Sequence, residues 1–161
     1  MKFNIEIAKE SPEWNNYPAI NENFLAEITK NILSEYSNFT KVKEFELSVL
    51  LTDDNQICKL NREFRNKNYA TNVLSFPDLD IHWTQILDFS PKTDYLYLGD
   101  IAFSYHTIHE EADNFKDHFV HLFIHSILHL IGYDHCNKKE ADVMESLEVK
   151  FLTNFNIASP Y

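Results

Sequence analysis

Glycine is nearly absent from this chain, which contains only Gly99 and Gly132 among its 161 residues. Glycine reaches left-handed backbone conformations without the steric penalty that other residues meet there. Both glycines fall inside segments that are singled out below for other reasons. We therefore expect each of them to have a specific structural role.

Cysteine is equally scarce, because Cys58 and Cys136 could form at most one disulfide bond. That count favours a reducing cytoplasm. The N-terminal stretch alternates apolar with polar residues and has no continuous apolar signal core, as its letters show: MKFNIEIAKESPEWNN. No segment approaches the roughly 20 uninterrupted apolar residues that a membrane span needs. The sequence thus predicts a soluble, cytoplasmic protein without membrane contact.

Basic residues are also few, since 14 Lys and Arg oppose 25 Asp and Glu, giving a net charge of −11. This balance argues against a nucleic-acid binder held by a general positive field. An anionic substrate would have to be met locally. Four cations, Lys59, Arg62, Arg65 and Lys67, gather in KLNREFRNK. Charge alone leaves open whether this cluster binds a ligand or is an ordinary solvated helix face.

The chain is 44% hydrophobic and of a length that suits one domain, which we expect to span residues 1–161. Alternating or β-rich patterns predict strands at 2–8, 44–52, 73–76 and 95–104. Helical spacing predicts helices at about 20–33, 54–64, 105–113, 115–131 and 138–154, with Asp53 or Asp54 capping the second. Residues 78–93 read as a surface loop or a partly helical insertion. This order predicts an α+β fold with a small mixed four-stranded sheet and helices packed on it.

Four histidines near the C-terminal end form the most informative pattern: His121, His125, His129 and, beyond Gly132, His135. Helical residues four apart lie about 6 Å apart along the axis, so His125 and His129 can share one ion. His121 and His129 are about 12 Å apart, which is too far for ligands of the same ion. Gly132 can end the helix in a left-handed conformation and bring His135 back toward it. We expect His125, His129 and His135 to be the ligands, on a zincin-like metal helix.

Three imidazoles leave a tetrahedral zinc ion one open position for water or substrate, which indicates a catalytic and not a structural metal site. Two other interpretations are buried core histidines and a closed structural site that has Cys136 as fourth ligand. The ligand spacing is also that of the metzincin proteases. Those enzymes carry a glutamate as general base after the first ligand, whereas this chain has Ser126, so a metalloprotease is the second choice.

The same residues resemble the hallmark of the YbeY family of bacterial metallo-endoribonucleases, H-G-x-L-H-L-x-G-Y-D-H, with Ser126 as the one departure. Three further segments are similar to family motifs in the same order, covering roughly residues 45–155. They are Leu60-Asn-Arg-Glu-Phe-Arg65, Thr71-Asn-Val-Leu-Ser-Phe-Pro77 and Leu98-Gly-Asp-Ile101 with Ser104. Asn72 stands where the family commonly has aspartate.

The resemblance implies a bacterial, cytoplasmic, zinc-dependent endoribonuclease that cuts single-stranded RNA. It implies a role in small-subunit 3′-end maturation of ribosomal RNA and in ribosome quality control. One Zn²⁺ ion is the expected cofactor, and ribosomal RNA, with ribosomal or assembly proteins, the expected partners. The position of the family's catalytic arginine matches Arg65. We therefore expect Arg65 and the metal ligand His125 to be the catalytic residues.

Four further residues are candidates for supporting roles in the site. Asp100 and Asp134 are candidates to orient the imidazoles, although either could instead be a turn or capping residue. Tyr69 and Phe76, near Arg65, could stack nucleobases or belong to the core. A third class of function also stays open, namely a noncatalytic ribosome-assembly factor that zinc merely stabilises.

Overall fold

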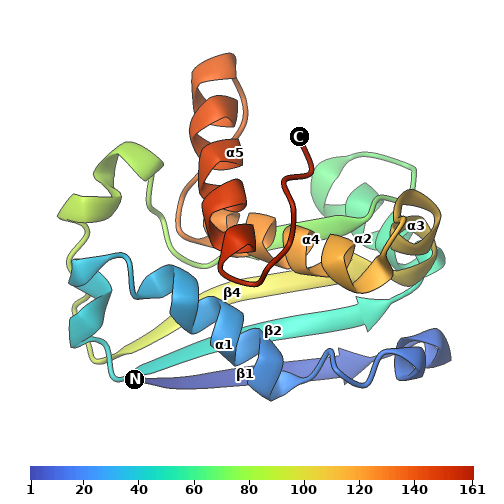
Figure 1. Cartoon of the computed structure of the whole chain (residues 1–161), viewed down its shortest axis with the longest axis horizontal. Coiled ribbons are helices and arrows are strands. Elements are labelled where there is room, and N and C mark those ends of the chain that lie inside the picture. The colour runs from blue at the N-terminus through green and yellow to red at the C-terminus, as the bar shows by residue number, and fades with distance from the viewer.

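A mixed four-stranded sheet organises the computed structural model, which describes residues 1–161 (Figure 1). The strand order is β1-β2-β4-β3, and the first three of these pair in parallel. β3 is antiparallel to β4 and forms one edge. The bounds are Lys2–Lys9 for β1, Glu44–Thr52 for β2, Val73–Pro77 for β3 and Tyr95–Ser104 for β4. The predicted α+β class with a mixed four-stranded sheet is therefore confirmed.

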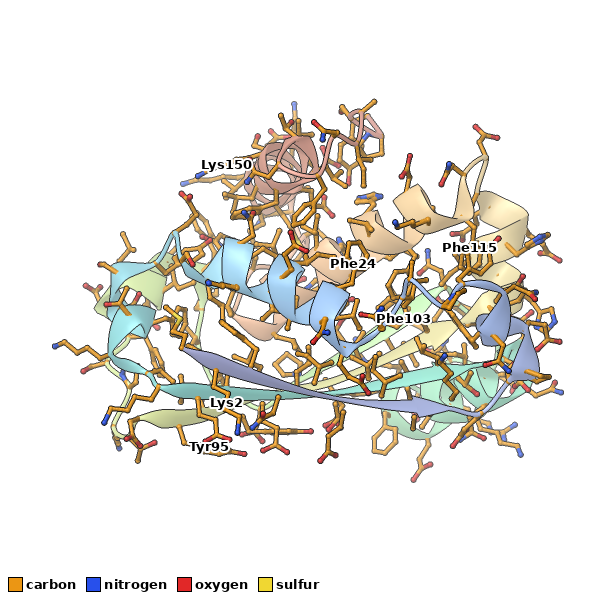
Figure 2. All side chains as sticks on the ribbon, turned by 60° about the horizontal axis from the view of Figure 1, so that its bottom comes forward. Lys2, Phe24, Tyr95, Phe103, Phe115 and Lys150 are labelled. Carbon is orange, nitrogen blue, oxygen red and sulfur yellow. The ribbon has the colours of Figure 1, made fainter.

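Helices cover both faces of this sheet. They are α1 (Glu22–Leu33), α2 (Asp54–Arg65), α3 (Tyr105–Glu111), α4 (Phe115–Leu130) and α5 (Lys138–Thr153). Figure 2 shows α1, α4 and α5 on one side of the sheet, with Tyr95 on the other side. α2 packs on that other side, where Ile57 joins Leu74 and Ala102 in a small apolar cluster. None of the helices is long and apolar enough to cross a membrane.

The main core lies between the sheet and α1 and α4, and it follows from the period of two in the strands. In β2 the alternate residues Phe45, Leu47, Val49 and Leu51 are buried. α4 packs on them with nine apolar residues and Ser126, so that ten of its 16 residues are buried. These are Phe115, Phe119, Val120, Leu122, Phe123, Ile124, Ser126, Ile127, Leu128 and Leu130. Because α4 is held on the sheet in this way, the histidines on its remaining face have defined positions.

Local signals set most element boundaries. α1 begins two residues later than the pattern of apolar residues suggests, because the Asn21 side chain caps it by accepting from the backbone N–H of Phe24. Asp53, not Asp54, caps α2 through the backbone N–H of Gln56. The segment 78–93 is a surface connection that contains a 3-10 helix, Trp83–Asp88, as the partly helical alternative predicts.

Candidate metal centre

α4 carries His125 and His129 one turn apart on the side that faces an open pocket of about 840 Å³. The Nε2 atoms of these two histidines are 3.0 Å apart. Two nitrogen ligands of one tetrahedral zinc ion lie about 3.3 Å apart, given zinc–nitrogen bonds of about 2.0 to 2.1 Å. The helix alone therefore brings two donor atoms to nearly the separation that a shared ion requires.

Gly132 turns the chain so that a third histidine joins them. α4 ends in a Schellman motif, in which the N–H of Gly132 donates to the carbonyl of His129 and that of Tyr133 to Leu128. Gly132 has a φ of +107°, and a Cβ there would lie 2.3 Å from the carbonyl oxygen of Ile81. Only glycine fits this turn, as the sequence suggests.

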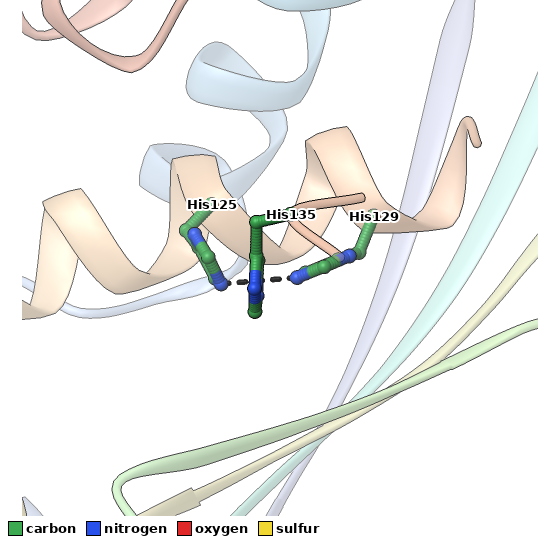
Figure 3. A group of neighbouring side chains, drawn as sticks. All are labelled: His125, His129 and His135. Carbon is green, nitrogen blue, oxygen red and sulfur yellow. Dashed lines mark hydrogen bonds between the residues drawn. The ribbon is translucent and has the colours of Figure 1, made fainter. Parts of the chain in front are cut away.

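His135, just after the turn, completes the cluster. One nitrogen from each of His125, His129 and His135 lies within 4.8 Å of the others, and the three rings converge on one point (Figure 3). His121 lies one turn before His125 and is outside the cluster, in agreement with the helix-rise argument. The predicted trio is thus brought together, and its donor set fits a metal ion.

Hydrogen bonds on the far side of two rings orient their Nε2 atoms toward this point. The Nδ1 of His129 lies 2.9 Å from the carbonyl oxygen of Tyr133, which can only accept, so Nδ1 carries the proton. The Nδ1 of His125 lies 2.7 Å from a carboxylate oxygen of Glu148. Both Nε2 atoms are then free to donate their lone pairs, which is the arrangement common to metal-binding histidines.

Glu148, on α5, is 1% exposed and receives three polar contacts. Its Oε1 contacts the Nδ1 of His125 and, at 3.3 Å, the Nε2 of His121, and its Oε2 accepts from the hydroxyl of Tyr161 at 2.7 Å. Burial by itself would raise the pKa of this carboxyl group, but the three hydrogen bonds outweigh burial and lower the pKa to about 2. Glu148 is therefore a fixed negative charge behind His125.

The electrostatics of His129 also suit a ligand. Burial, reinforced by the positive charges that His125 and His135 can carry, lowers the pKa of His129 to about 4. The imidazole is then neutral at physiological pH, which is the form that binds metals. The protein does not need to remove a proton from this side chain before an ion binds.

Arg65, the last residue of α2, lines the same pocket next to the edge strand β3. Its Nη2 donates to the carbonyl oxygen of Ser75 at 2.7 Å, and its guanidinium lies 5.6 Å from the centre of the Phe76 ring. It forms no salt bridge. The fold thus joins the predicted arginine and the three histidines, which are 60 or more residues apart in sequence, in one pocket.

The other candidate residues form no hydrogen bond with the imidazole rings and do not join the donor cluster. Asp100 is exposed on β4 and accepts a hydrogen bond from the hydroxyl of Tyr97, so the expectation that it orients an imidazole is not met. Asp134 accepts from the backbone N–H of His135 and acts as a turn residue. Cys136 is outside the donor cluster, which leaves the closed four-ligand site without support.

Sequence reasoning missed Glu148 and Tyr161. One signal for Glu148 was available, because this residue lies on the buried face of α5 together with Met144, Phe151 and Leu152. A glutamate inside an apolar stripe needs a buried polar partner. For Tyr161, which follows an irregular segment, the sequence carries no comparable signal.

Three converging imidazoles with an open side, in a polar pocket of an α+β fold, define a metal-dependent hydrolase as the class of this protein. Comparison with known proteins makes the class specific. The family model described as Endoribonuclease YbeY matches residues 12–156. The chain belongs to the YbeY endoribonuclease family, and its resemblance to that family is confirmed.

Two individual proteins support this assignment. The chain is 37% identical over 163 residues to the Endoribonuclease YbeY of Bartonella quintana (strain Toulouse), covering 98% of this chain and 96% of that protein. The solution structure of TM1509 from Thermotoga maritima is similar with a TM-score of 0.51 and 20% identity, covering 94% of this chain and 91% of that one. At this identity the second likeness concerns the fold alone.

Proposed function

We propose that this protein is a single-strand-specific, zinc-dependent endoribonuclease of the bacterial cytoplasm. Its task is maturation of the 3′ end of small-subunit ribosomal RNA, together with ribosome quality control. The observation that carries the proposal is the single pocket that Arg65 lines together with the cluster of His125, His129 and His135. A metal site joined to an unpaired guanidinium matches the chemistry of phosphodiester cleavage.

His125, His129 and His135 would hold one zinc ion, which when bound supplies Lewis acidity toward a phosphoryl oxygen and toward water. The protein's own contribution to this step is orientation. Glu148 and the carbonyl of Tyr133 fix the His125 and His129 rings, so that their Nε2 atoms need no rearrangement when the site is loaded.

Arg65 binds and stabilises the phosphate. One Nη2 hydrogen bond ties its guanidinium to the Ser75 carbonyl, and the Phe76 ring supports one face. The remaining N–H groups are free for bidentate hydrogen bonds to a phosphate, whose negative charge increases in the transition state. Because no carboxylate pairs with Arg65, its positive charge is fully available to the substrate.

The protease alternative loses support at Ser126. This residue occupies the position of the metzincin general base, but its side chain is 0% exposed and makes no hydrogen bond. It therefore cannot contact a substrate in the pocket. Arg65 also occupies the carbonyl of Ser75 on the edge strand, where an extended peptide would otherwise pair.

The test compares purified, zinc-loaded protein with three variants on a fluorescent single-stranded oligoribonucleotide and on ribosomal RNA. We expect Arg65→Ala to keep its zinc content and to lower kcat/KM by about 10²- to 10³-fold. His129→Ala should lose both zinc and cleavage. Arg62→Ala is the matched control, since Arg62 lies on the same helix, contacts Asn68 and does not line the pocket.

Three results would overturn the proposal. The first is RNA cleavage that survives both Arg65→Ala and zinc removal, since this indicates a contaminating nuclease and favours the noncatalytic assembly factor. The second is cleavage of unstructured peptides without cleavage of RNA, which favours the protease. The third is cleavage of fully paired RNA as efficient as that of single strands.

A further inference from the structure

Tyr69 is an exposed aromatic side chain whose ring and hydroxyl group have no aromatic or hydrogen-bonding partner in the protein. Four large aromatic residues are exposed, namely Phe64, Tyr69, Tyr95 and Tyr161. Phe64 packs against Phe76, and the hydroxyl groups of Tyr95 and Tyr161 donate to glutamates. Tyr69 has no aromatic partner, its hydroxyl forms no hydrogen bond, and 55% of its surface is exposed. Such an unpaired ring is available for an external ligand.

The backbone of Tyr69 is nevertheless held firmly. Asn61, which is 3% exposed, donates from Nδ2 to the carbonyl of Tyr69 at 2.9 Å. The carbonyl of Asn61 accepts the N–H of Lys67 at 3.2 Å, and Asn66 turns the chain with a φ of +55°. The loop after α2 is thus tied to that helix at two points. Tyr69 is a ring on a fixed support, which lowers the entropy lost on binding.

The pocket that Tyr69 lines has an uneven charge distribution. The pocket is lined by one arginine, Arg65, and one lysine, Lys67. Both come from the same short segment as Tyr69, and neither forms a salt bridge. Its carboxylates, Asp80, Asp134 and Glu140, come from other segments of the chain. In a protein with a net charge of −11, a polyanion is attracted to the segment that carries the two free cations.

Phe76, the second aromatic side chain near Arg65, is already occupied. The guanidinium of Arg65 lies 5.6 Å from the centre of its ring, and the Phe64 ring packs against it at 5.4 Å. A nucleobase would have to displace one of these neighbours. Tyr69 has no such competitor.

We propose that Tyr69 is the stacking platform for one nucleobase of the RNA, next to the phosphate that Arg65 binds, with Lys67 contacting a neighbouring phosphate. This inference rests on the proposed function and adds a base subsite to it. Stacking on a tyrosine uses the π-face that every base has, so the subsite accepts any base. It requires an unpaired base, which gives a physical reason for a preference for single strands.

The experiment is an abasic scan. A labelled single-stranded oligoribonucleotide with cleavage-resistant backbone linkages is compared with copies that each lack one base, and binding to the zinc-loaded protein is followed by fluorescence anisotropy. For the wild-type protein, loss of one particular base should weaken binding by about 5- to 150-fold, the range for one stacked base. Tyr69→Ala should weaken binding of the intact strand by a similar factor, and removal of that base should then have no further effect.

Two variants serve as controls. Tyr69→Phe keeps the ring and should bind like the wild type, and Tyr95→Ala removes an exposed tyrosine at the start of β4 that does not line the pocket. The inference is overturned if Tyr69→Ala binds the intact strand like the wild type. It is also overturned if each abasic strand binds less tightly than the intact strand by the same factor for the wild type and for Tyr69→Ala. A wild-type protein that neither binds nor cuts RNA would instead overturn the proposed function itself.

Discussion

At the scale of single residues, Glu148 shows that a side chain distant in the sequence can orient a residue of the site. The spacing of the histidines identifies the donors, but the orientation of His125 depends on a carboxylate 23 positions away, on a different helix. His121 and Tyr161 contact the same carboxylate and so help to hold it in place. His121, the histidine that helix rise excludes from the metal, thus has a place behind the cluster.

We expect Glu148→Gln to lower zinc affinity by about 10- to 100-fold, the range for loss of a partner that orients a metal ligand. Tyr161→Phe should lower it less, because the carboxylate keeps its other two contacts. Competition with a chromophoric chelator measures both. Asp142→Asn, which removes an exposed carboxylate from the same helix, should leave the affinity unchanged. Wild-type affinity in Glu148→Gln would contradict an orienting role.

At the scale of elements, the turn after α4 links backbone geometry to the metal site. The Schellman motif at Gly132 both ends the helix and places His135 beside His125 and His129. It also brings the turn against the 78–93 connection, through the close approach of Gly132 to Ile81. The end of the helix and the geometry of the histidine cluster therefore depend on the same glycine.

Gly132→Ala is expected to lower the free energy of unfolding by about 1 to 3 kcal/mol, since it combines a strained φ with a backbone clash. Zinc affinity should fall with it. The control is Asn21→Ala, which removes the N-cap of α1 at a cost of about 1 kcal/mol and touches no histidine. Thermal unfolding and chelator competition separate the two effects. If Gly132→Ala lost stability but kept full zinc affinity, the link would be disproved.

At the scale of the whole molecule, a net charge of −11 means that the proposed RNA substrate would be held by few cations against a repulsive background. The pocket contains only Arg65 and Lys67 for this purpose. Each phosphate that is neutralised on a single strand contributes about −0.7 to the slope of log affinity against log salt.

We therefore expect a slope of about −1.4 for a short single strand, reduced by about 0.7 in Lys67→Ala. Lys43→Ala should not change the slope, because Lys43 is exposed, pairs with Asp94 and lies outside the pocket. Anisotropy titrations between low and moderate salt give the slopes. A wild-type slope steeper than about −4 would contradict a two-cation contact, since it requires a basic surface that the pocket lacks.

Much of this protein follows from its sequence alone. The period of two predicts β2 with the observed bounds, because strands in a two-faced sheet alternate buried and exposed residues, and richness in β-forming residues predicts β4. The His125, His129 and His135 trio follows from helix geometry and one glycine, and the family from four motifs. These are local properties, in which the interacting residues lie within a few turns of one another.

Tertiary structure decided everything that depends on contact between distant segments. It brought Arg65 and the histidines into one pocket, assigned the orienting role to Glu148 in place of Asp100, and left Tyr69 exposed while Phe76 contacts Arg65. The physical reason is that sequence periodicity tells which face of an element is buried but not which neighbour covers it. That choice is made only when the helices pack on the sheet.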